Sequence, residues 1–191
     1  MVLTQVKRLM IRHDLWATPV WEVPTGFDAK FNNQLLAEIS KIQAVPGSNF
    51  NLWNHADNTE CISKLRETIL REIGEAVKED IPNGKMVLTR GWVNHHRPGT
   101  SLVTHNHGNT IIACTYYAKA PKGCGDLLLI DPRGGSNWGW ETEGYVAGVK
   151  HKRFTPKEGS LVFFPGFLLH SVEENKSSQV RVSISSNLIF A

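Results

Sequence analysis

A chain of 191 residues is long enough for one domain with a hydrophobic core. Its hydrophobic content of 41% and charged content of 20% are ordinary globular values, which excludes a disordered or fibrous chain. The formal net charge of +3 comes from scattered basic residues, so no nucleic acid is expected as an obligatory partner.

Neither a membrane nor an oxidising compartment is indicated. No apolar run approaches the roughly 20 residues of a membrane span, and the first residues lack signal-peptide architecture. The cysteines are odd in number and widely spaced, at Cys61, Cys114 and Cys124. They form no disulfide framework, so free thiols in a reducing cytoplasm are expected.

The first half of the chain predicts two helices. One begins after Asp28, a candidate N-cap, and must end before Pro46, because apolar residues recur every three or four positions between them. The second runs from about Thr59 to Asp80, where Asn58 or Thr59 can cap it and a Pro-Asn-Gly turn follows. Both apolar stripes are predicted to face a core.

From residue 85 onward, short apolar segments are separated by turn residues, which favours an antiparallel sandwich or barrel over a βαβ sheet. A Gly- and Trp-rich stretch from Arg133 to Gly148 is typical of a long loop, with Trp138 and Trp140 as candidates for a substrate lid or an exposed aromatic surface. We expect a single domain over 1–191, with a helical part (1–84) packed on a β core (85–191). The candidate strands are 85–94, 101–107, 110–118, 126–130, 159–164 and 180–189.

Three histidines are candidates for a metal site. His105 and His107 are two residues apart, so on an extended segment both project from one face, and neutral imidazole suits Fe(II), Zn(II), Cu or Ni. Such pairs are more often hydrogen-bonded than metal-bound, so the pair alone identifies no site. His170 follows an apolar strand and a Pro-Gly turn, where an imidazole needs a metal or a backbone carbonyl as partner.

The last predicted strand has polar residues on one face, at Arg181, Ser183, Ser185 and Asn187. This face is either exposed to solvent or, with Arg181 buried, a receptor for a carboxylate, because Arg offers a bidentate fork and the Ser hydroxyl adds a donor.

The order of these motifs, His105-Asn106-His107, then His170, then Arg181-Val182-Ser183, resembles the 2-oxoglutarate/Fe(II) dioxygenase superfamily. Those enzymes carry His-x-Asp/Glu, a distal His, and an Arg-x-Ser that holds the distal carboxylate of the oxo-acid. The likeness is closer to a group of small members found in bacteria and phages, and it covers roughly residues 85–190. The further segments that carry it are Gly91-Trp92-Val93-Asn94, Tyr116-Tyr117, Asp131-Pro132-Arg133, 164–170 and 181–187.

The resemblance implies a mainly β fold with N-terminal helices, the double-stranded β-helix (jelly roll, cupin-like). It implies Fe(II) held by the three histidines, 2-oxoglutarate as co-substrate against Arg181 and Ser183, and O2 as oxidant. The expected activity is hydroxylation of a peptide side chain or a small metabolite. Tyr116 and Tyr117 point to opposite faces of their strand, and Tyr117 is assigned to the oxo-acid pocket together with Asn94, which shares a face with Trp92.

One position departs from the superfamily pattern, because His107 stands where a carboxylate ligand is usual. Three neutral imidazoles leave iron more positive than two imidazoles and one carboxylate do. An active three-histidine oxygenase, an inactive relative and a site for a different metal all remain open. Asp126 or Asp131 supplies an acid only if the chain folds it close to the histidines.

Two other functions remain open at this point. A cupin-like metalloprotein that does not use 2-oxoglutarate would employ the same histidines and leave Arg181 unexplained. A non-catalytic jelly-roll binding module would leave the histidines metal-free. His95 and His96 are adjacent and cannot both face one metal from a strand, so surface roles are expected for both. Neither the substrate nor the oligomeric state follows from the sequence.

Overall fold

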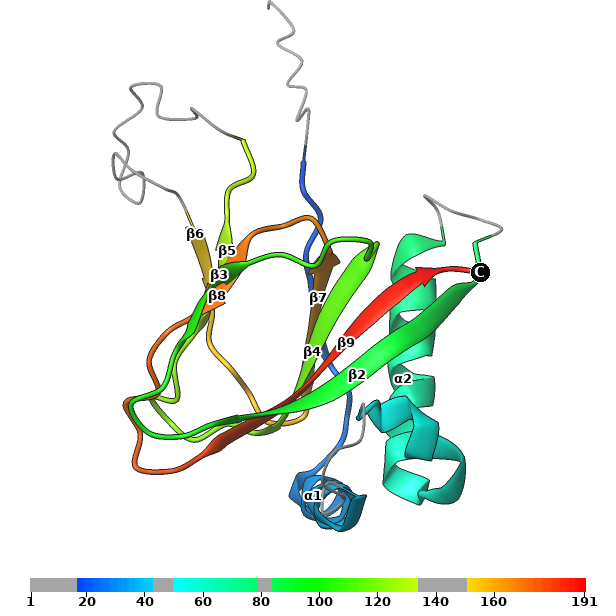
Figure 1. Cartoon of the computed structure of the whole chain (residues 1–191), viewed down its shortest axis with the longest axis vertical. Helices are drawn as coiled ribbons and strands as arrows, with labels where there is room; N and C mark the ends of the chain where they lie inside the picture. The colour runs from blue at the N-terminus through cyan, green and yellow to red at the C-terminus, as the bar shows by residue number, and fades with distance from the viewer. Residues whose placement is uncertain (1–16, 43–49, 79–83, 134–150) are drawn as a thin grey trace, which may run out of the picture.

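The computed structural model describes residues 17–42, 50–78, 84–133 and 151–191. The predicted helices correspond to α1 and α2, and β-strands dominate the rest (Figure 1). The elements are β1 (Trp21–Pro24), α1 (Ala29–Ile42), the 3-10 helix η1 (Leu52–Asn58), α2 (Glu60–Val77), β2 (Met86–His96), β3 (Leu102–His105), β4 (Ile112–Lys119), β5 (Leu127–Ile130), β6 (His151–Phe154), β7 (Ser160–Pro165), β8 (His170–Val172) and β9 (Arg181–Phe190).

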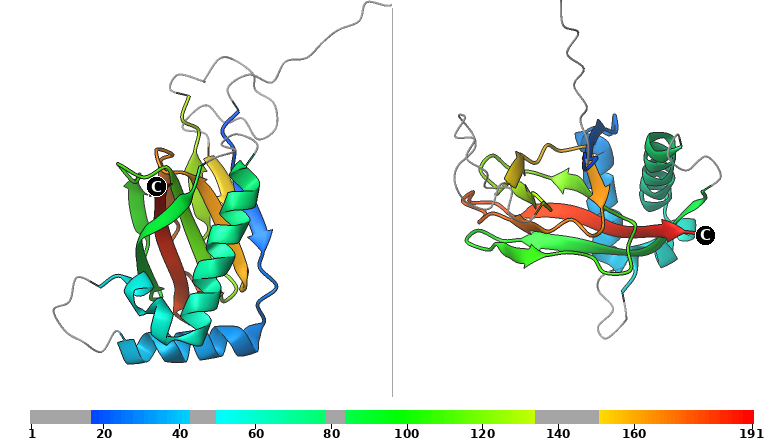
Figure 2. Two further views of the ribbon diagram at one scale, coloured as in Figure 1. Left: turned by 90° about the vertical axis from the view of Figure 1, so that its right-hand side faces the viewer. Right: turned by 90° about the horizontal axis from the view of Figure 1, so that it is seen from above.

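The strands form two facing antiparallel sheets. One has the order β1-β7-β4-β9-β2 and the other β3-β8-β5-β6. Strands β2 to β5 alternate between the sheets along the chain, as do β7 to β9, so the two sheets are wound together. This arrangement confirms the predicted double-stranded β-helix. Figure 1 shows the two sheets facing each other, and Figure 2 shows the same layers from two other sides.

All six predicted strands are present with small shifts at their ends, and the structure adds β1, β6 and β8. The sequence of β6 is His-Lys-Arg-Phe at a sheet edge, and three of its four residues are exposed. Charged residues protect such an edge from pairing, and they also remove the apolar alternation by which a strand is recognised.

The helices begin where predicted, but only one is capped as predicted. The Phe31 backbone N–H donates to Asp28 Oδ1 at 2.8 Å, which confirms Asp28 as a cap. Thr59 is the N-cap residue of α2, one of the two candidates, but its side chain makes no capping hydrogen bond and donates its hydroxyl to the His55 carbonyl instead. The Glu38 carboxylate of α1 accepts from Cys61 N at 3.1 Å and therefore supplies the missing acceptor.

The outer face of the larger sheet packs on the helices. Figure 2 shows α2 lying across this face, with α1 across one end of it. Alternate residues of β4, such as Cys114 and Tyr116, join the apolar cluster under α2, whereas Ala113 and Tyr117 belong to a second cluster between the sheets. No helix within the described ranges is long and apolar enough to cross a membrane. The single-domain organisation stays a prediction.

Candidate functional site

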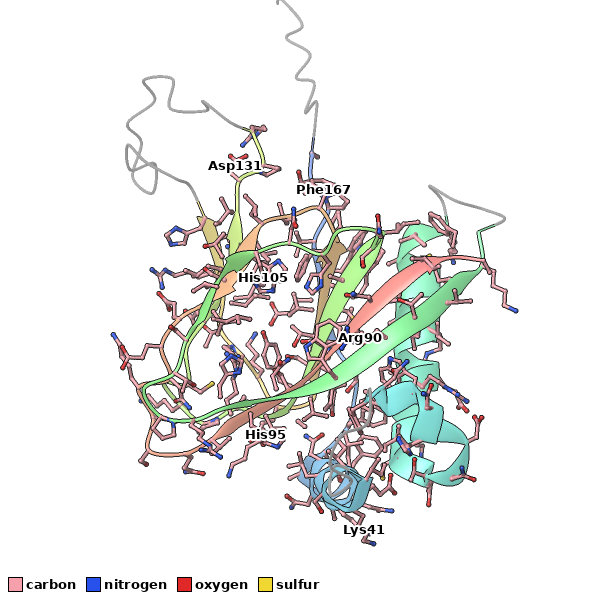
Figure 3. The ribbon with its side chains drawn as sticks, in the orientation of Figure 1. Lys41, Arg90, His95, His105, Asp131 and Phe167 are labelled. Atoms are coloured by element: carbon pink, nitrogen blue, oxygen red, sulfur yellow. The ribbon has the colours of Figure 1, made fainter. Side chains whose placement is uncertain are left out.

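The three predicted histidines meet at the edge of the smaller sheet. His105 ends β3 and lies opposite His170, the first residue of β8. Their nearest ring nitrogens and those of His107 all lie within 4.8 Å of one another. His107 Nε2 is 3.3 Å from His170 Nε2. The structure therefore brings together β3, the residues just after it and β8, which are far apart in the chain, and all three histidines line one cavity. His105 is labelled in Figure 3.

Backbone hydrogen bonds fix the tautomers of two of these rings. Nδ1 of His105 lies 2.9 Å from the Val103 carbonyl, and Nδ1 of His170 lies 2.9 Å from the Leu168 carbonyl. A carbonyl only accepts, so both Nδ1 atoms carry the proton and both Nε2 atoms present a lone pair. Burial lowers the pKa of His170 to about 4 and also lowers that of His107, so these imidazoles are neutral at pH 7.

The spacing of the His107 and His170 nitrogens fits a shared metal ion. Metal–nitrogen bonds of about 2.1 Å at angles between octahedral and tetrahedral values place two ligand nitrogens roughly 3.0 to 3.4 Å apart. The 3.3 Å between His107 Nε2 and His170 Nε2 lies within that range. A neutral imidazole donor set suits Fe(II), and the Nδ1 bonds to carbonyls orient the rings as second partners of metal ligands do.

No carboxylate joins the histidines among the residues that the structure describes. Neither Asp126 nor Asp131 lines the cavity beside them. Asp131 lies beyond the end of β5 (Figure 3), and its carboxylate accepts from Arg133 Nη2 at 2.6 Å. The acid ligand that the sequence left open is therefore not supplied by either of these residues.

The histidines face a cavity between the two sheets, with about 490 Å³ of empty space including its open mouth. The lining from β2 and β9 is polar apart from Trp92, and the rest of the lining includes apolar side chains such as Leu127 and Phe164. It consists of Trp92, Asn94, His96, Leu102, His105, His107, Ala113, Cys114, Thr115, Tyr117, Leu127, Phe164, His170, Val172, Arg181, Ser183 and Ser185.

Arg181 is a buried cation in this cavity, with 2% of its surface exposed. Its Nη1 donates to the Gly125 carbonyl at 3.1 Å and its Nη2 contacts His96 Nδ1 at 2.9 Å. Its Nε is buried without a partner, and no carboxylate of the described chain pairs with the guanidinium. Burial lowers the pKa of Arg181. A desolvated, unpaired cation with free donors binds an anion strongly.

The other predicted pocket residues surround Arg181. Ser183 is buried two positions along β9 on the same face, and the Tyr117 ring centroid lies 6.0 Å from Arg181 Cζ. Burial raises the pKa of Tyr117, so its phenol stays protonated as a donor. Asn94 Nδ2 donates to Ser185 Oγ at 2.9 Å. The ring of Trp92 lies beside His107.

The surface role expected for both neighbouring histidines is wrong for His96. His95 is exposed, but His96 is buried and contacts Arg181. Alternation along β2 carried the missed signal, because His96 shares the face of Asn94 and Trp92. The proposed lid residues Trp138 and Trp140 lie outside the described residues.

Comparison with known proteins agrees with this geometry. Residues 90–187 match the family described as "Putative 2OG-Fe(II) oxygenase". No curated protein matches the chain in sequence.

Solved structures similar to this chain share its fold at low sequence identity. The non-haem α-ketoglutarate-dependent epimerase SnoN from nogalamycin biosynthesis is 14% identical, with 90% of this chain and 78% of that chain covered and a TM-score of 0.64. HygX from Streptomyces hygroscopicus, with nickel and 2-oxoglutarate bound, is 10% identical (90% and 81% covered, TM-score 0.62). A Pseudomonas putida prolyl-4-hydroxylase is 15% identical (91% and 89% covered, TM-score 0.59).

These likenesses support the fold, and the sequence match supports the chemistry. The match covers the three histidines and Arg181. It excludes the two alternatives from the sequence, the cupin-like metalloprotein that does not use 2-oxoglutarate and the non-catalytic binding module. The chain belongs to the 2OG-Fe(II) oxygenase family and is an enzyme that depends on iron and 2-oxoglutarate.

Proposed function

We propose that Nε2 of His105, His107 and His170 hold Fe(II), and that 2-oxoglutarate binds between this metal and Arg181. The single observation that carries the proposal is one cavity lined by both a three-histidine cluster and a buried arginine without a carboxylate partner. The cluster fits a divalent metal and the arginine fits a carboxylate. A co-substrate with a metal-chelating end and a distal carboxylate satisfies both at once.

The roles of the residues follow from their hydrogen bonds. His105 and His170 keep their Nε2 lone pairs aimed at the metal because Nδ1 is held by backbone carbonyls. Arg181 and Ser183 donate to the distal carboxylate of the oxo-acid, and Tyr117 adds a phenol donor beside them. Asn94 lies on the same face of the cavity and is assigned to the co-substrate as well. The chemistry that iron and oxo-acid supply when bound is activation of O2, coupled to oxidative decarboxylation that yields succinate and CO2.

The histidine at position 107 changes the charge of the site. Three neutral imidazoles leave both charges of Fe(II) uncompensated within the described lining, and Arg181 adds a further positive charge. The two carboxylates of 2-oxoglutarate offset much of this charge. We therefore expect the affinity for the oxo-acid to fall more steeply with rising ionic strength than in a site with a carboxylate ligand. The prime substrate is assigned to the class of peptide side chains or small metabolites, with hydroxylation as the outcome.

Anaerobic visible spectroscopy tests the proposal. Fe(II) followed by 2-oxoglutarate should give a weak metal-to-ligand charge-transfer band that requires both additions. Arg181→Ala should lose this band at 2-oxoglutarate concentrations that saturate the unsubstituted protein, whereas His95→Ala should keep it, because His95 is exposed. Absence of the band together with tight zinc binding would contradict the proposed site.

A further inference from the structure

His96 and Arg181 form a buried pair, of which only Arg181 has a role in the proposed function. They lie opposite each other in the pairing of β2 with β9, and Arg181 Nη2 lies 2.9 Å from His96 Nδ1. A guanidinium only donates, so His96 Nδ1 must be the acceptor and the imidazole proton must reside on Nε2. Burial, with the charge of Arg181, lowers the pKa of His96 to about 4, so the ring is neutral at pH 7.

The pair is held in place from both sides. The backbone carbonyl of His96 accepts from Asn175 Nδ2 at 2.8 Å, and Asn175 is almost completely buried. The same amide nitrogen donates to the Gln179 carbonyl, two residues before Arg181. The second acceptor of the guanidinium is the carbonyl of Gly125. Both groups that orient Arg181 are therefore neutral, and both are fixed by the surrounding loops and strands.

A neutral acceptor has a different effect on Arg181 from a carboxylate. A carboxylate at position 96 would hold the guanidinium equally well but would also compensate its charge and compete with any anion in the cavity. An apolar residue would leave the charge but not the orientation. Only a neutral acceptor fixes the direction of the remaining N–H donors and leaves the charge available.

We propose that His96 is a positioning residue for the co-substrate: its neutral Nδ1 aims the guanidinium of Arg181 at the distal carboxylate of the oxo-acid without neutralising it. This inference rests on the proposed function, because it takes 2-oxoglutarate as the anion that Arg181 receives. His96 itself acts through Arg181 and need not touch the reacting atoms.

Binding measurements on the Fe(II)-loaded protein without O2 test this role, with two probes. One is 2-oxoglutarate, and the other is 2-oxobutyrate, which chelates a metal in the same way but has no distal carboxylate. His96→Leu should weaken 2-oxoglutarate binding about tenfold, the range for a lost hydrogen bond to a charged group. His96→Asn keeps an acceptor at the position of Nδ1 and should stay within about threefold of the unsubstituted protein. His96→Asp should weaken 2-oxoglutarate binding at least as much as His96→Leu, and His95→Leu should change nothing.

Binding of 2-oxobutyrate should be unchanged in every variant, which a merely structural role for His96 does not predict. Equal losses for both oxo-acids, or unchanged 2-oxoglutarate binding in His96→Leu, would overturn the inference and leave the proposed function standing. If His96→Leu fails to fold, the isosteric pair of Asn and Asp decides, because equal affinities in these two variants would overturn it. Failure of the unsubstituted protein to bind 2-oxoglutarate with Fe(II) would instead overturn the proposed function, and the inference with it.

Discussion

The two faces of the larger sheet are built from the same strands but have different roles. On β9, Ile184 and Leu188 point to the helices and are fully buried in an apolar cluster. The alternate residues Arg181 and Ser183, which precede Ile184 on the same strand, line the cavity and are just as buried but polar. Burial on the helix face stabilises the fold, whereas burial on the cavity face leaves the Nε donor of Arg181 without a partner.

This difference assigns stability and chemistry to alternate residues of one strand. Apolar burial contributes roughly 1.5 to 3 kcal/mol for each large side chain. The stabilisation from the helix face therefore offsets the cost of burying polar groups on the cavity face. A substitution on the helix face should therefore change the free energy of unfolding and spare ligand binding. A substitution on the cavity face should do the reverse.

The largest effect is expected for His170→Ala on the cavity face. Loss of one metal ligand should abolish conversion of 2-oxoglutarate to succinate and weaken Fe(II) binding by more than about 100-fold. The free energy of unfolding of the metal-free protein should fall by only about 1 kcal/mol, because the Leu168 carbonyl loses its donor. Succinate release and metal titration measure the first effect and urea unfolding the second. His151→Ala, in the exposed strand β6, is the control, and full turnover by His170→Ala would contradict the ligand assignment.

On the helix face, Ile69→Ala should give the opposite pattern. Ile69 lies on the buried side of α2 with 0% of its surface exposed, so its truncation leaves a cavity in the apolar cluster. The free energy of unfolding should fall by about 2 to 5 kcal/mol. Affinity for 2-oxoglutarate, measured well below the unfolding temperature, should be unchanged. A matching loss of affinity would show that the two faces are energetically coupled.

The pH dependence of the free energy of unfolding tests whether His96 on the cavity face is neutral. The pKa of His96 is about 4 in the folded chain and 6.5 without the protein environment, so the unfolded chain takes up the proton first as the pH falls. The stabilisation due to neutral His96 is complete above pH 6.5, declines below it and is lost near pH 4. Between pH 7 and pH 5 the metal-free protein should lose about 2 kcal/mol more than His96→Asn. Parallel losses in urea unfolding at the two pH values would contradict the buried, neutral state of His96.

The sequence predicted those parts of the site that follow from local alternation. Strand β9 alternates polar and apolar residues from Arg181 to Ile184, which predicts that Arg181 and Ser183 share one face. The likeness of the spaced motifs to a known superfamily added iron as the metal and 2-oxoglutarate as the co-substrate. Periodicity did not predict β8, because three residues are too few to show a period.

The contacts that sequence reasoning missed join residues far apart in the chain. His96 contacts Arg181, which lies 85 positions away, and alternation along β2 indicates its face but not this partner. Glu38 accepts from Cys61 N, 23 positions on, where local rules favoured Asn58 or Thr59 as the cap. Local propensity ranks the residues that can cap a helix, but tertiary packing decides which acceptor reaches its N–H groups.

The smallest effect is expected for Glu38→Ala at this tertiary cap. The carboxylate accepts from Cys61 N and Ile62 N at the start of α2, where it also interacts favourably with the helix dipole. Its removal should lower the free energy of unfolding by about 1 kcal/mol. Burial and, second to it, Glu38 raise the pKa of Cys61 to about 11, so Glu38→Ala should lower that pKa, seen as faster thiol alkylation at pH 9. Glu75→Ala, at an exposed pair with Lys78, should change neither quantity. Because Glu38 lies on the helix side, its loss should leave 2-oxoglutarate affinity unaltered; reduced affinity would mean that α2 helps to set the cavity, and the division between the two faces would fail.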